Sequence, residues 1–444
     1  MTFMEAEEYI NRIPRFADSH TLKDSRSYLD TLGSPDDGMK IIHVAGTNGK
    51  GSVCNYLTEI LIDAGYHVGT FISPHLVTIR ERMSVDGEMI SEDDFARYCG
   101  IVREKLANKY AFPADSFPNC TYMEFLFHMA MIWFRDKGVD WVVLETGLGG
   151  RLDVTNCVRS KKMTVITRIG MDHMQYLGNT IAAIAGEKAG IIRNGTPVVT
   201  LTEPAEAYDV ICMRAKETGA PVFAVDRNNY KSSYDSGKSI DFSFYNRYDL
   251  AEIHCTLNTV AAYQIENCAL AVCAASLLRG DDGQKSVTND NICRGISKAF
   301  WPARMEEIAP GVFIDGGHNA DGIDAFIESV SKITLPEGGK RYLLFSAVKD
   351  KQYGIMMDRL VLSGLFSGIA MAPMSDTPRS LGSGELRSIA SDHDSTCFEV
   401  YRSAEEALQK LMAAKQKSDL VFAAGSLYLA GEIKAAVMKN AATT

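Results

Sequence analysis

The chain has 444 residues, of which 46% are hydrophobic and 23% charged, and its formal net charge is −10. This length exceeds one ordinary domain core, so two domains are expected. The acidic balance argues against a nucleic-acid binder. The ten cysteines include no C-x-x-C pair, which argues against a zinc site. The most apolar stretch, Phe125–Phe134, is too short for a membrane span, and no apolar leader opens the chain, so we expect a cytoplasmic protein.

Strand-like apolar runs alternate with helical patterns, which predicts an α/β fold with a mostly parallel sheet. Lys40–Ala45 is predicted to be a buried strand, Ser52–Ala64 a helix and His67–Ile72 a second strand, so that the three form a βαβ unit. Further strands are expected at Asp140–Leu144 and Thr164–Thr167.

A helix is predicted from Ile181 to about Ile192, with Asn179 or Thr180 as its cap. Two polar stretches, Lys231–Ser239 and Gly280–Asp290, are predicted to be loops.

The strand pattern restarts after residue 300 and predicts a second, smaller α/β domain of Rossmann-like kind. Its expected strands are Gly311–Asp315, Arg341–Ala347, Gly368–Ala372 and Asp419–Ala424. We therefore predict domains at residues 1–299 and 300–444.

The strongest local signal is a glycine-rich turn between the first strand and the helix. It comprises Gly46, Thr47, Asn48, Gly49, Lys50, Gly51 and Ser52. Glycines let backbone N–H groups face phosphate oxygens, and a helix N-terminus favours an anion. Lys50 is suited to the β- and γ-phosphates and Ser52 to Mg²⁺. The alternative is a glycine-rich turn with no ligand, and the strand and helix on either side argue against it.

Polar residues follow three predicted strands, and in a parallel sheet the strand ends border one crevice. Ser73 ends the second strand, Glu145 ends DWVVL, and Asp172 and His173 follow the strand at Thr164–Thr167. A carboxylate beside a phosphate loop suits Mg²⁺, which prefers oxygen ligands. Taken alone, His173 is better explained as a helix cap.

Lys188 lies among small and apolar residues of a predicted helix. A buried lysine is costly unless it is paired or neutral. It could pair with Glu187 or another carboxylate, extend to solvent, or be carbamylated by CO₂. Composition alone does not decide among these.

Several runs in the same order resemble the Mur ligase superfamily, and within it the folylpolyglutamate synthase/dihydrofolate synthase family. The runs are HVAGTNGKGSV, ISPHL, ETGLGGRLDVTN and MDHMQYLGNTIAAIAGEKAGI, followed by WPARME, DGGHN, FSAVKDK and GSLYL. The resemblance implies that ATP phosphorylates a carboxylate of dihydropteroate or of a folate, and that L-glutamate attacks the acyl phosphate. It implies small-molecule partners, Mg²⁺, no nucleic acid, no membrane and a monomer.

The resemblance also implies residue roles. Gly46–Ser52 would cradle ATP, with Asn267, Arg304 and Asp315 as further nucleotide contacts. Ser73, Glu145 and His173 would serve magnesium, and Lys188 matches a carbamylated lysine. Lys50, Glu145, His173, Lys188 and His318 would be catalytic. The expected substrate residues are Thr121, Tyr122, Met123, Glu124, Leu152, Asp153, Val154 and, near the glutamate site with His318, Ser426.

Three positions depart from the family pattern. Ala303 stands where glycine is usual, Gly317 replaces alanine, and Ala262-Tyr263-Gln264 replaces Gly-His-Gln. The alternatives are another Mur-type amide ligase, a P-loop kinase or GTPase, and a non-enzymatic nucleotide-binding module. The sequence does not distinguish addition of the first glutamate from addition of later ones.

Overall fold

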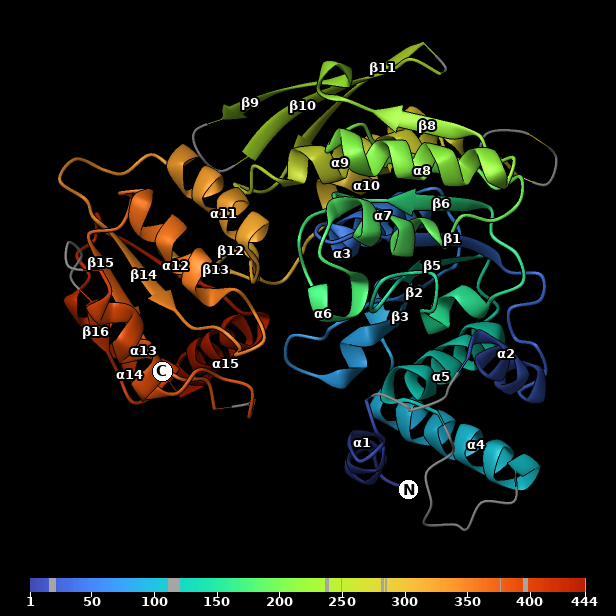
Figure 1. Ribbon diagram of the computed structural model, residues 1–444, viewed down its shortest axis with the longest axis horizontal. Helices are drawn as coiled ribbons and strands as arrows, with labels where there is room; N and C mark the ends of the chain where they lie inside the picture. The colour runs from blue at the N-terminus through green and yellow to red at the C-terminus, as the bar shows by residue number, and fades with distance from the viewer. Residues whose placement is uncertain are drawn as a thin grey trace. The chain divides into compact units, whose positions relative to one another are not determined.

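The computed structural model describes residues 1–15, 21–110, 120–235, 239–248, 250–280, 283, 286–375, 377–393 and 398–443. The chain forms two compact units (Figure 1). The first comprises Met1–Lys231, Phe242–Thr256 and Glu266–Ala299, and the second comprises Ser232–Asp241, Leu257–Ile265 and Phe300–Thr444.

An eight-stranded sheet forms the centre of the first unit, in the order β4-β3-β2-β5-β1-β6-β7-β8. The six strands β2, β5, β1, β6, β7 and β8 run parallel to one another. At the edge beside β2, β3 and β4 are added by antiparallel pairing. The predicted parallel α/β sheet is confirmed. The strands are β1 (Lys40–Ala45), β2 (Val68–Phe71), β3 (Met83–Val85), β4 (Glu88–Met89), β5 (Trp141–Glu145), β6 (Met163–Ile166), β7 (Val198–Leu201) and β8 (Val222–Val225).

Helices pack on this sheet through separate hydrophobic clusters. One cluster joins apolar residues of α1, α2, α4 and α5 to β2 and β5, and another joins α7 and α8 to β6 and β7. The helices are α1 (Phe3–Asn11), α2 (Leu22–Thr31), α3 (Lys50–Asp63), α4 (Glu92–Tyr110), α5 (Tyr122–Lys137), α6 (Met174–Leu177), α7 (Ile181–Ala189), α8 (Ala205–Glu217), α9 (Gln264–Leu277) and α10 (Asn289–Lys298), with the 3-10 turns η1 (Ile79–Arg82), η2 (Val154–Cys157) and η3 (Arg227–Asn229).

The predicted helix after residue 180 is confirmed as α7, but it ends at Ala189 rather than near Ile192. Its cap is Thr180, whose Oγ1 accepts a hydrogen bond from Ala183 N–H (3.1 Å). A capping hydroxyl satisfies one of the unpaired N–H groups of the first turn.

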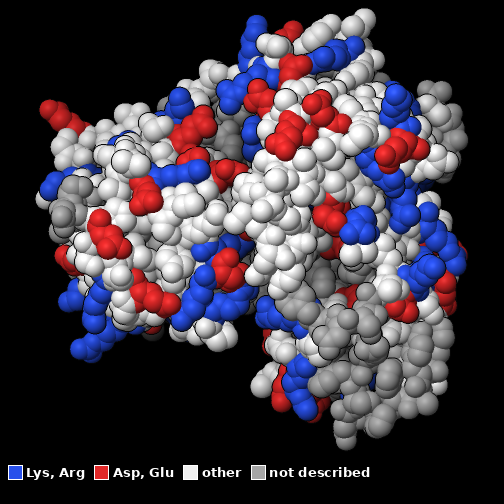
Figure 2. Space-filling view, in the orientation of Figure 1, with Lys and Arg blue, Asp and Glu red and all other residues white. Residues whose placement is uncertain are grey.

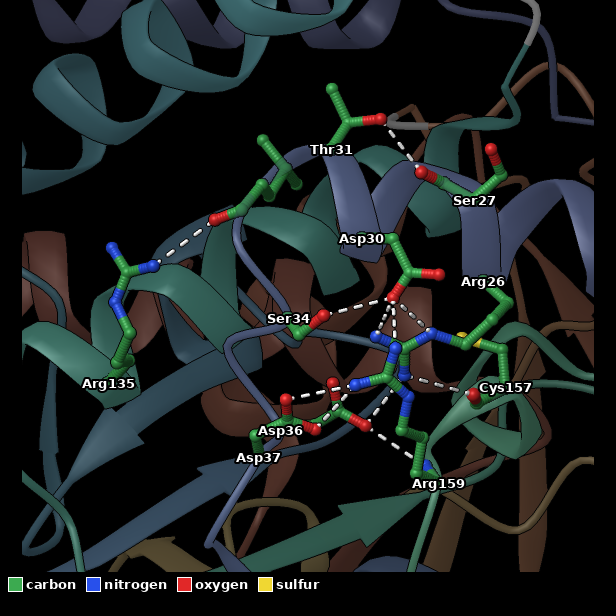
Figure 3. A network of polar contacts seen from close by, with 11 residues as sticks. Arg26, Ser27, Asp30, Thr31, Ser34, Asp36, Asp37, Arg135, Cys157 and Arg159 are labelled. Carbon is green, nitrogen blue, oxygen red and sulfur yellow. Dashed lines mark hydrogen bonds and ion pairs between the residues drawn. The ribbon is translucent and has the colours of Figure 1, made fainter.

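Charged residues anchor α2 to the segment that follows η2 (Figure 3). Arg26 pairs with buried Asp36 (2.7 Å) and with Asp30 (2.7 Å). Arg159 pairs with the same Asp30 (2.8 Å) and with Asp37 (2.8 Å). Because the two guanidinium groups share one carboxylate, α2 is held in a fixed position beside the loop that carries Asp153 and Val154.

The loop predicted at Lys231–Ser239 is wrong over its described residues. β9 (Tyr230–Asp235) and the start of β10 (Ser239–Asn246) occupy it, and with β11 (Ala251–Leu257) they form a three-stranded sheet in the order β11-β10-β9. The polar residues of β9 suggested a loop, yet an edge strand with exposed side chains needs no apolar residues because pairing satisfies its backbone. The loop predicted at Gly280–Asp290 lies partly outside the described residues, and its last two residues begin α10.

The second unit contains a six-stranded sheet in the order β12-β13-β17-β14-β15-β16. Only the β12–β13 pair is antiparallel among the described pairs. The predicted Rossmann-like domain is confirmed, and β12 is an additional edge strand. The elements are β12 (Arg304–Ala309), β13 (Val312–Asp315), α11 (Ala320–Lys332), β14 (Arg341–Phe345), α12 (Tyr353–Leu362), β15 (Gly368–Met371), α13 (Ser383–Ser391), β16 (Phe398–Val400), α14 (Ala404–Ala414), β17 (Leu420–Ala424) and α15 (Leu427–Thr443).

Acidic and basic side chains are interspersed over the face of the molecule seen in Figure 2. Within the described part of the chain, no helix combines the length and the apolar composition that a bilayer crossing requires.

Close packing of α10 on α3 predicts the effect of one substitution. A Cβ on Gly295 would lie 2.5 Å from Ile60 Cα. We expect Gly295→Ala to lower the free energy of unfolding by about 3 kcal/mol, because backbone atoms cannot move aside as a flexible side chain does. Gly100→Ala is the control, since a Cβ there meets nothing within 4 Å. Urea denaturation checks both variants, and equal stability of the two would contradict the packing.

Candidate active site

The phosphate loop between β1 and α3 is held by the segment that follows β6. Thr47 N–H donates to Arg168 O (2.9 Å), and Thr167 Oγ1 donates to Asn48 O (2.7 Å). A Cβ on Gly46 would lie 1.8 Å from Thr167 Oγ1. Glycine is therefore required at residue 46 by this neighbouring side chain.

The loop ends at the N-terminus of α3. Gly49 is the cap, with φ 88°, and a Cβ there would lie 2.1 Å from Asn267 Oδ1. Lys50 begins the helix and its Nζ donates to Thr47 O (3.2 Å), while Ser52 is buried in the first turn. The end of a 14-residue helix places N–H groups and a partial positive charge at this point. The loop N–H groups, Lys50 and Asn267 thus provide the donors and the positive charge that an anion would need.

Glu145 and Ser73 lie together beside this loop. Glu145 is the buried last residue of β5, and its Oε2 accepts a hydrogen bond from Ser73 N–H (3.0 Å). A Cβ on Gly51 would lie 3.6 Å from the same oxygen, so the carboxylate borders the first turn of α3. Carboxylate and hydroxyl oxygens suit Mg²⁺. The two residues have the ligand chemistry that a magnesium ion would require.

His173 contacts its own neighbour. It precedes α6 with φ 49°, its N–H donates to Asp172 Oδ1 (2.8 Å), and its Nε2 lies 4.0 Å from Asp172 Oδ2. In the described ranges, no three His, Cys, Asp or Glu side chains converge as a metal cage. Mg²⁺ commonly takes one or two protein carboxylates and completes its shell with water and phosphates. The arrangement therefore suits a magnesium–nucleotide complex better than a bare ion.

Lys188 is buried, and its amine points to the loop between β1 and α3. Its Nζ donates to Gly46 O (2.7 Å). Burial first, and then the charge of Lys50, lower the pKa of Lys188 to about 7, against the opposing effects of Asp172 and Asp153. The amine therefore binds the first residue of the loop and becomes increasingly neutral as the pH rises above that value.

Two sequence interpretations of Lys188 are wrong. Glu187 forms its ion pair with Arg151 (2.8 Å), so it is not the partner expected for Lys188. The side chain does not extend to solvent, since Lys188 is 4% exposed. Just after α7, the chain packs closely on the loop that follows β5, because a Cβ on Gly190 would lie 2.3 Å from Arg151 Cβ.

The segment predicted to bind substrate at residues 121–124 begins α5. Thr121 and Glu124 form a capping box, in which Glu124 Oε2 accepts from Thr121 N–H (2.7 Å). The other oxygen, Oε1, accepts from Ser25 Oγ (2.5 Å). Tyr122 is buried, and the Arg82 guanidinium lies 5.4 Å from its ring centroid. Glu124 consequently fixes the start of the helix and joins it to Ser25, whereas Tyr122 and Arg82 form a buried cation–π contact.

The second predicted substrate segment, residues 152–154, meets the first at Gly147. A Cβ on Gly147 would lie 3.3 Å from Met123 Cε and 3.4 Å from Asp153 Oδ2. Asp153 accepts four hydrogen bonds within its loop, from the N–H groups of Gly147, Leu148 and Thr155 and from Thr155 Oγ1. Leu152 is 65% exposed, whereas Val154 is buried. Asp153 shapes the loop, and Leu152 presents an apolar surface.

In the second unit, Arg304 and Asp315 face each other in the β12–β13 register. The ends of β13 and β17 are joined by a bond from Gly425 N–H to Gly317 O (3.0 Å). This bond brings the loop of His318, whose Nδ1 lies 2.8 Å from Gly316 O, beside the buried Ser426. The residues predicted near the glutamate site therefore lie at neighbouring strand ends.

Two polar residues of this unit, Ser346 and Tyr263, were not predicted as site residues from the sequence. Ser346 follows β14, is fully buried, and its Oγ has no hydrogen-bond partner among the described residues. Its only signal was the run FSAVKDK. Tyr263 donates from Oη to Asp315 Oδ2 (2.6 Å), and its signal was the departure from Gly-His-Gln.

Comparison with known proteins gives the family. Residues 111–275 match the Mur ligase middle domain, and residues 303–427 match the glutamate ligase domain of Mur ligases. The chain is 32% identical over 439 residues to the dihydrofolate synthase/folylpolyglutamate synthase of Bacillus subtilis, covering 97% of this chain and 98% of the relative. The chain belongs to the folylpolyglutamate synthase/dihydrofolate synthase family. This family belongs to the Mur-type ATP-dependent ligases, and the chain is therefore one of them.

Solved structures agree with this assignment. An FPGS–AMPPCP–folate complex has a TM-score of 0.84 and 31% identity, and the alignment covers 98% of this chain and 99% of that one. Escherichia coli FolC in complex with DHPP and ADP has a TM-score of 0.83 and 26% identity, over 100% of this chain and 99% of that one.

The lowered pKa of Lys188 predicts a pH dependence of stability. In the unfolded chain the amine keeps its proton up to its ordinary pKa of 10.5, and in the folded chain only up to about 7. Folding therefore releases a proton between these values, so the free energy of unfolding should rise with pH across this window. The difference in free energy of unfolding between the wild-type protein and Lys188→Met should increase by about 1.4 kcal/mol for each pH unit in this window. Urea titrations of both proteins in CO₂-free buffer, where Lys188 keeps a free amine, measure this rise. A difference that does not change with pH would contradict the loss of the proton on folding.

Proposed function

We propose that this protein is an ATP-dependent ligase that adds L-glutamate to a folate, to dihydropteroate, or to both. The γ-phosphoryl group of ATP passes to a carboxylate oxygen, which gives an acyl phosphate and ADP. The glutamate amine then attacks the acyl carbon, an amide forms, the amine loses a proton, and phosphate leaves. The observation that carries the proposal is the phosphate loop with Lys50 and Glu145 at one helix N-terminus, in a chain of this family.

Each of these groups has a physical task. Lys50 and the N–H groups of the loop stabilise charge on the phosphoryl group as it transfers. Glu145 and Ser73, with His173, would hold magnesium, which supplies positive charge to the β- and γ-phosphates. The FPGS complex with AMPPCP and folate and the FolC complex with DHPP and ADP support these substrates. The acyl phosphate also requires that the site exclude water.

We also propose that Lys188 is carbamylated. A neutral amine attacks CO₂, forms a carbamate and releases one proton, and the pKa of about 7 makes this form accessible. The carbamate nitrogen keeps one N–H, which can still donate to Gly46 O. Its oxygens would add negative charge near the magnesium site.

The remaining roles are assigned to the two parts of the chain. We assign ATP and folate binding to residues 1–299, with Asn267 as a nucleotide contact and residues 121–124 and 152–154 at the pterin. We assign glutamate ligation to residues 300–444, with Arg304 and Asp315 serving the nucleotide and His318 and Ser426 serving glutamate. The protein acts as a monomer in the cytoplasm. All nine described cysteines are free thiols, which suits a reducing compartment.

Phosphate release identifies the acceptor. With ATP, Mg²⁺ and L-glutamate, we expect release that depends on dihydropteroate, on tetrahydrofolate, or on both. Dependence on one acceptor assigns one activity, and dependence on both assigns a bifunctional enzyme. No stimulation by either pterin would overturn the folate assignment and favour another Mur-type amide ligase.

Substitutions at the phosphate site test the roles of its charged groups. We expect Lys50→Ala and Glu145→Ala to fold and to lower kcat by at least about 100-fold, because each removes charge stabilisation from the transferring phosphoryl group. Lys216→Ala, at an exposed position of α8, is the control and should keep wild-type kcat. Wild-type turnover in either site variant would refute the assignment.

A further inference from the structure

The segment that carries Arg304 has an unusual backbone. Ala303 and Met305 both have positive φ, 54° and 51°, although both carry a Cβ. The pairing of β12 with β13 shifts register between Arg304 and Glu306, so the segment is a β-bulge. Left-handed backbone is unfavourable for such residues and persists only where surrounding contacts hold it.

Two carboxylates provide these contacts, since Glu306 Oε2 accepts from Ala303 N–H (2.8 Å) and Asp315 binds the rest of the bulge. Its Oδ2 accepts from Met305 N–H (3.0 Å), and its Oδ1 accepts from Gly317 N–H (2.8 Å). Gly316 N–H donates to Ala303 O (2.8 Å) on the other side of the bulge. Asp315 is 2% exposed, and burial raises the pKa of its carboxyl, so its charge depends on Arg304 and on these donors in place of water.

Tyr263 adds a further donor to the same carboxylate. Its Oη donates to Asp315 Oδ2 (2.6 Å), and the neighbouring Ala262 N–H donates to Ser329 Oγ (2.9 Å), which fixes the backbone beside it. Burial first, and then the negative charge of Asp315, raise the pKa of Tyr263 well above its ordinary value, so the hydroxyl keeps its proton. A hydrogen bond to an ionised acceptor is about twice as strong as a neutral one.

The bulge determines where the Arg304 side chain lies. Its Nη1 donates to Ala303 O (3.0 Å), and a Cβ on Gly316 would lie 2.3 Å from Nη1. The guanidinium is therefore packed over Gly316, and a change in the Ala303–Met305 backbone would move it.

We propose that Tyr263 is a positioning residue, which through Asp315 holds the Ala303–Met305 bulge and so presents Arg304 to the nucleotide. The inference rests on the proposed function, because it assigns Arg304 a nucleotide contact. It explains why Asp315 needs a donor from outside its own sheet, since two backbone N–H groups leave acceptor capacity on a buried carboxylate.

The test compares Tyr263→Phe with the wild-type protein. Binding of the non-hydrolysable analogue AMPPCP with Mg²⁺, measured by calorimetry, should weaken by about tenfold, because one charge-assisted hydrogen bond is lost. KM for ATP should rise by a similar factor while kcat changes less. Hydrogen exchange of the Met305 amide should become faster. In Tyr263→His, an imidazole N–H that reaches Asp315 should restore much of the affinity.

The matched control is Tyr98→Phe. Tyr98 Oη also donates to an aspartate, Asp136 (3.1 Å), but between α4 and α5 of the first unit. We expect it to leave AMPPCP affinity unchanged. An equal loss of affinity in both variants, or unchanged AMPPCP affinity or unchanged Met305 exchange in Tyr263→Phe, would overturn the proposal. Analogue binding needs no turnover, so a failure of the ligase assay alone overturns the proposed function and not this inference.

Discussion

The hydrogen bond from Lys188 Nζ to Gly46 O is the constraint on which the candidate site depends. A buried amine cannot be left without a partner, so α7 must lie against the loop that follows β1. Just beyond this helix, Gly190 lies against the loop that follows β5, where a side chain would clash with Arg151. The ion pair of Arg151 with Glu187 joins α7 to that same loop after β5. One polar contact thus connects the packing of the first unit with the geometry of its phosphate loop.

The order of the strands brings the remaining groups together. β5 lies between β1 and β2, and Val44 pairs with Glu145 in the parallel register. The loop after β1, the end of β5 and Ser73 after β2 therefore open at the same edge of the sheet. Backbone N–H groups and Lys50 provide local positive charge at this edge, although the net charge of the chain is −10.

The bulge in the second unit combines an unfavourable backbone conformation with hydrogen bonds that stabilise it. Ala303 occupies a left-handed conformation that glycine would adopt without cost, yet the bulge is kept because Asp315, Gly316 and Tyr263 bind its surroundings. Ala303 and Tyr263, two departures from the family pattern, thus lie in one hydrogen-bonded region. A change at one position of such a network alters the demands on the others.

The sequence by itself determined the α/β architecture, because runs such as KIIHVA and DWVVL are apolar enough to be buried strands in any packing. It also predicted the glycine-rich turn between the strand β1 and the helix α3, because glycines and a helix start are local features of the chain. Only the tertiary structure decided that Lys188 bonds Gly46 rather than Glu187, that Asp153 is occupied by its own loop, and that Tyr263 reaches Asp315. It also decided that polar β9 is a strand. Partners of polar side chains and edge strands come from segments distant in the chain, and local composition carries no information on which segment that is.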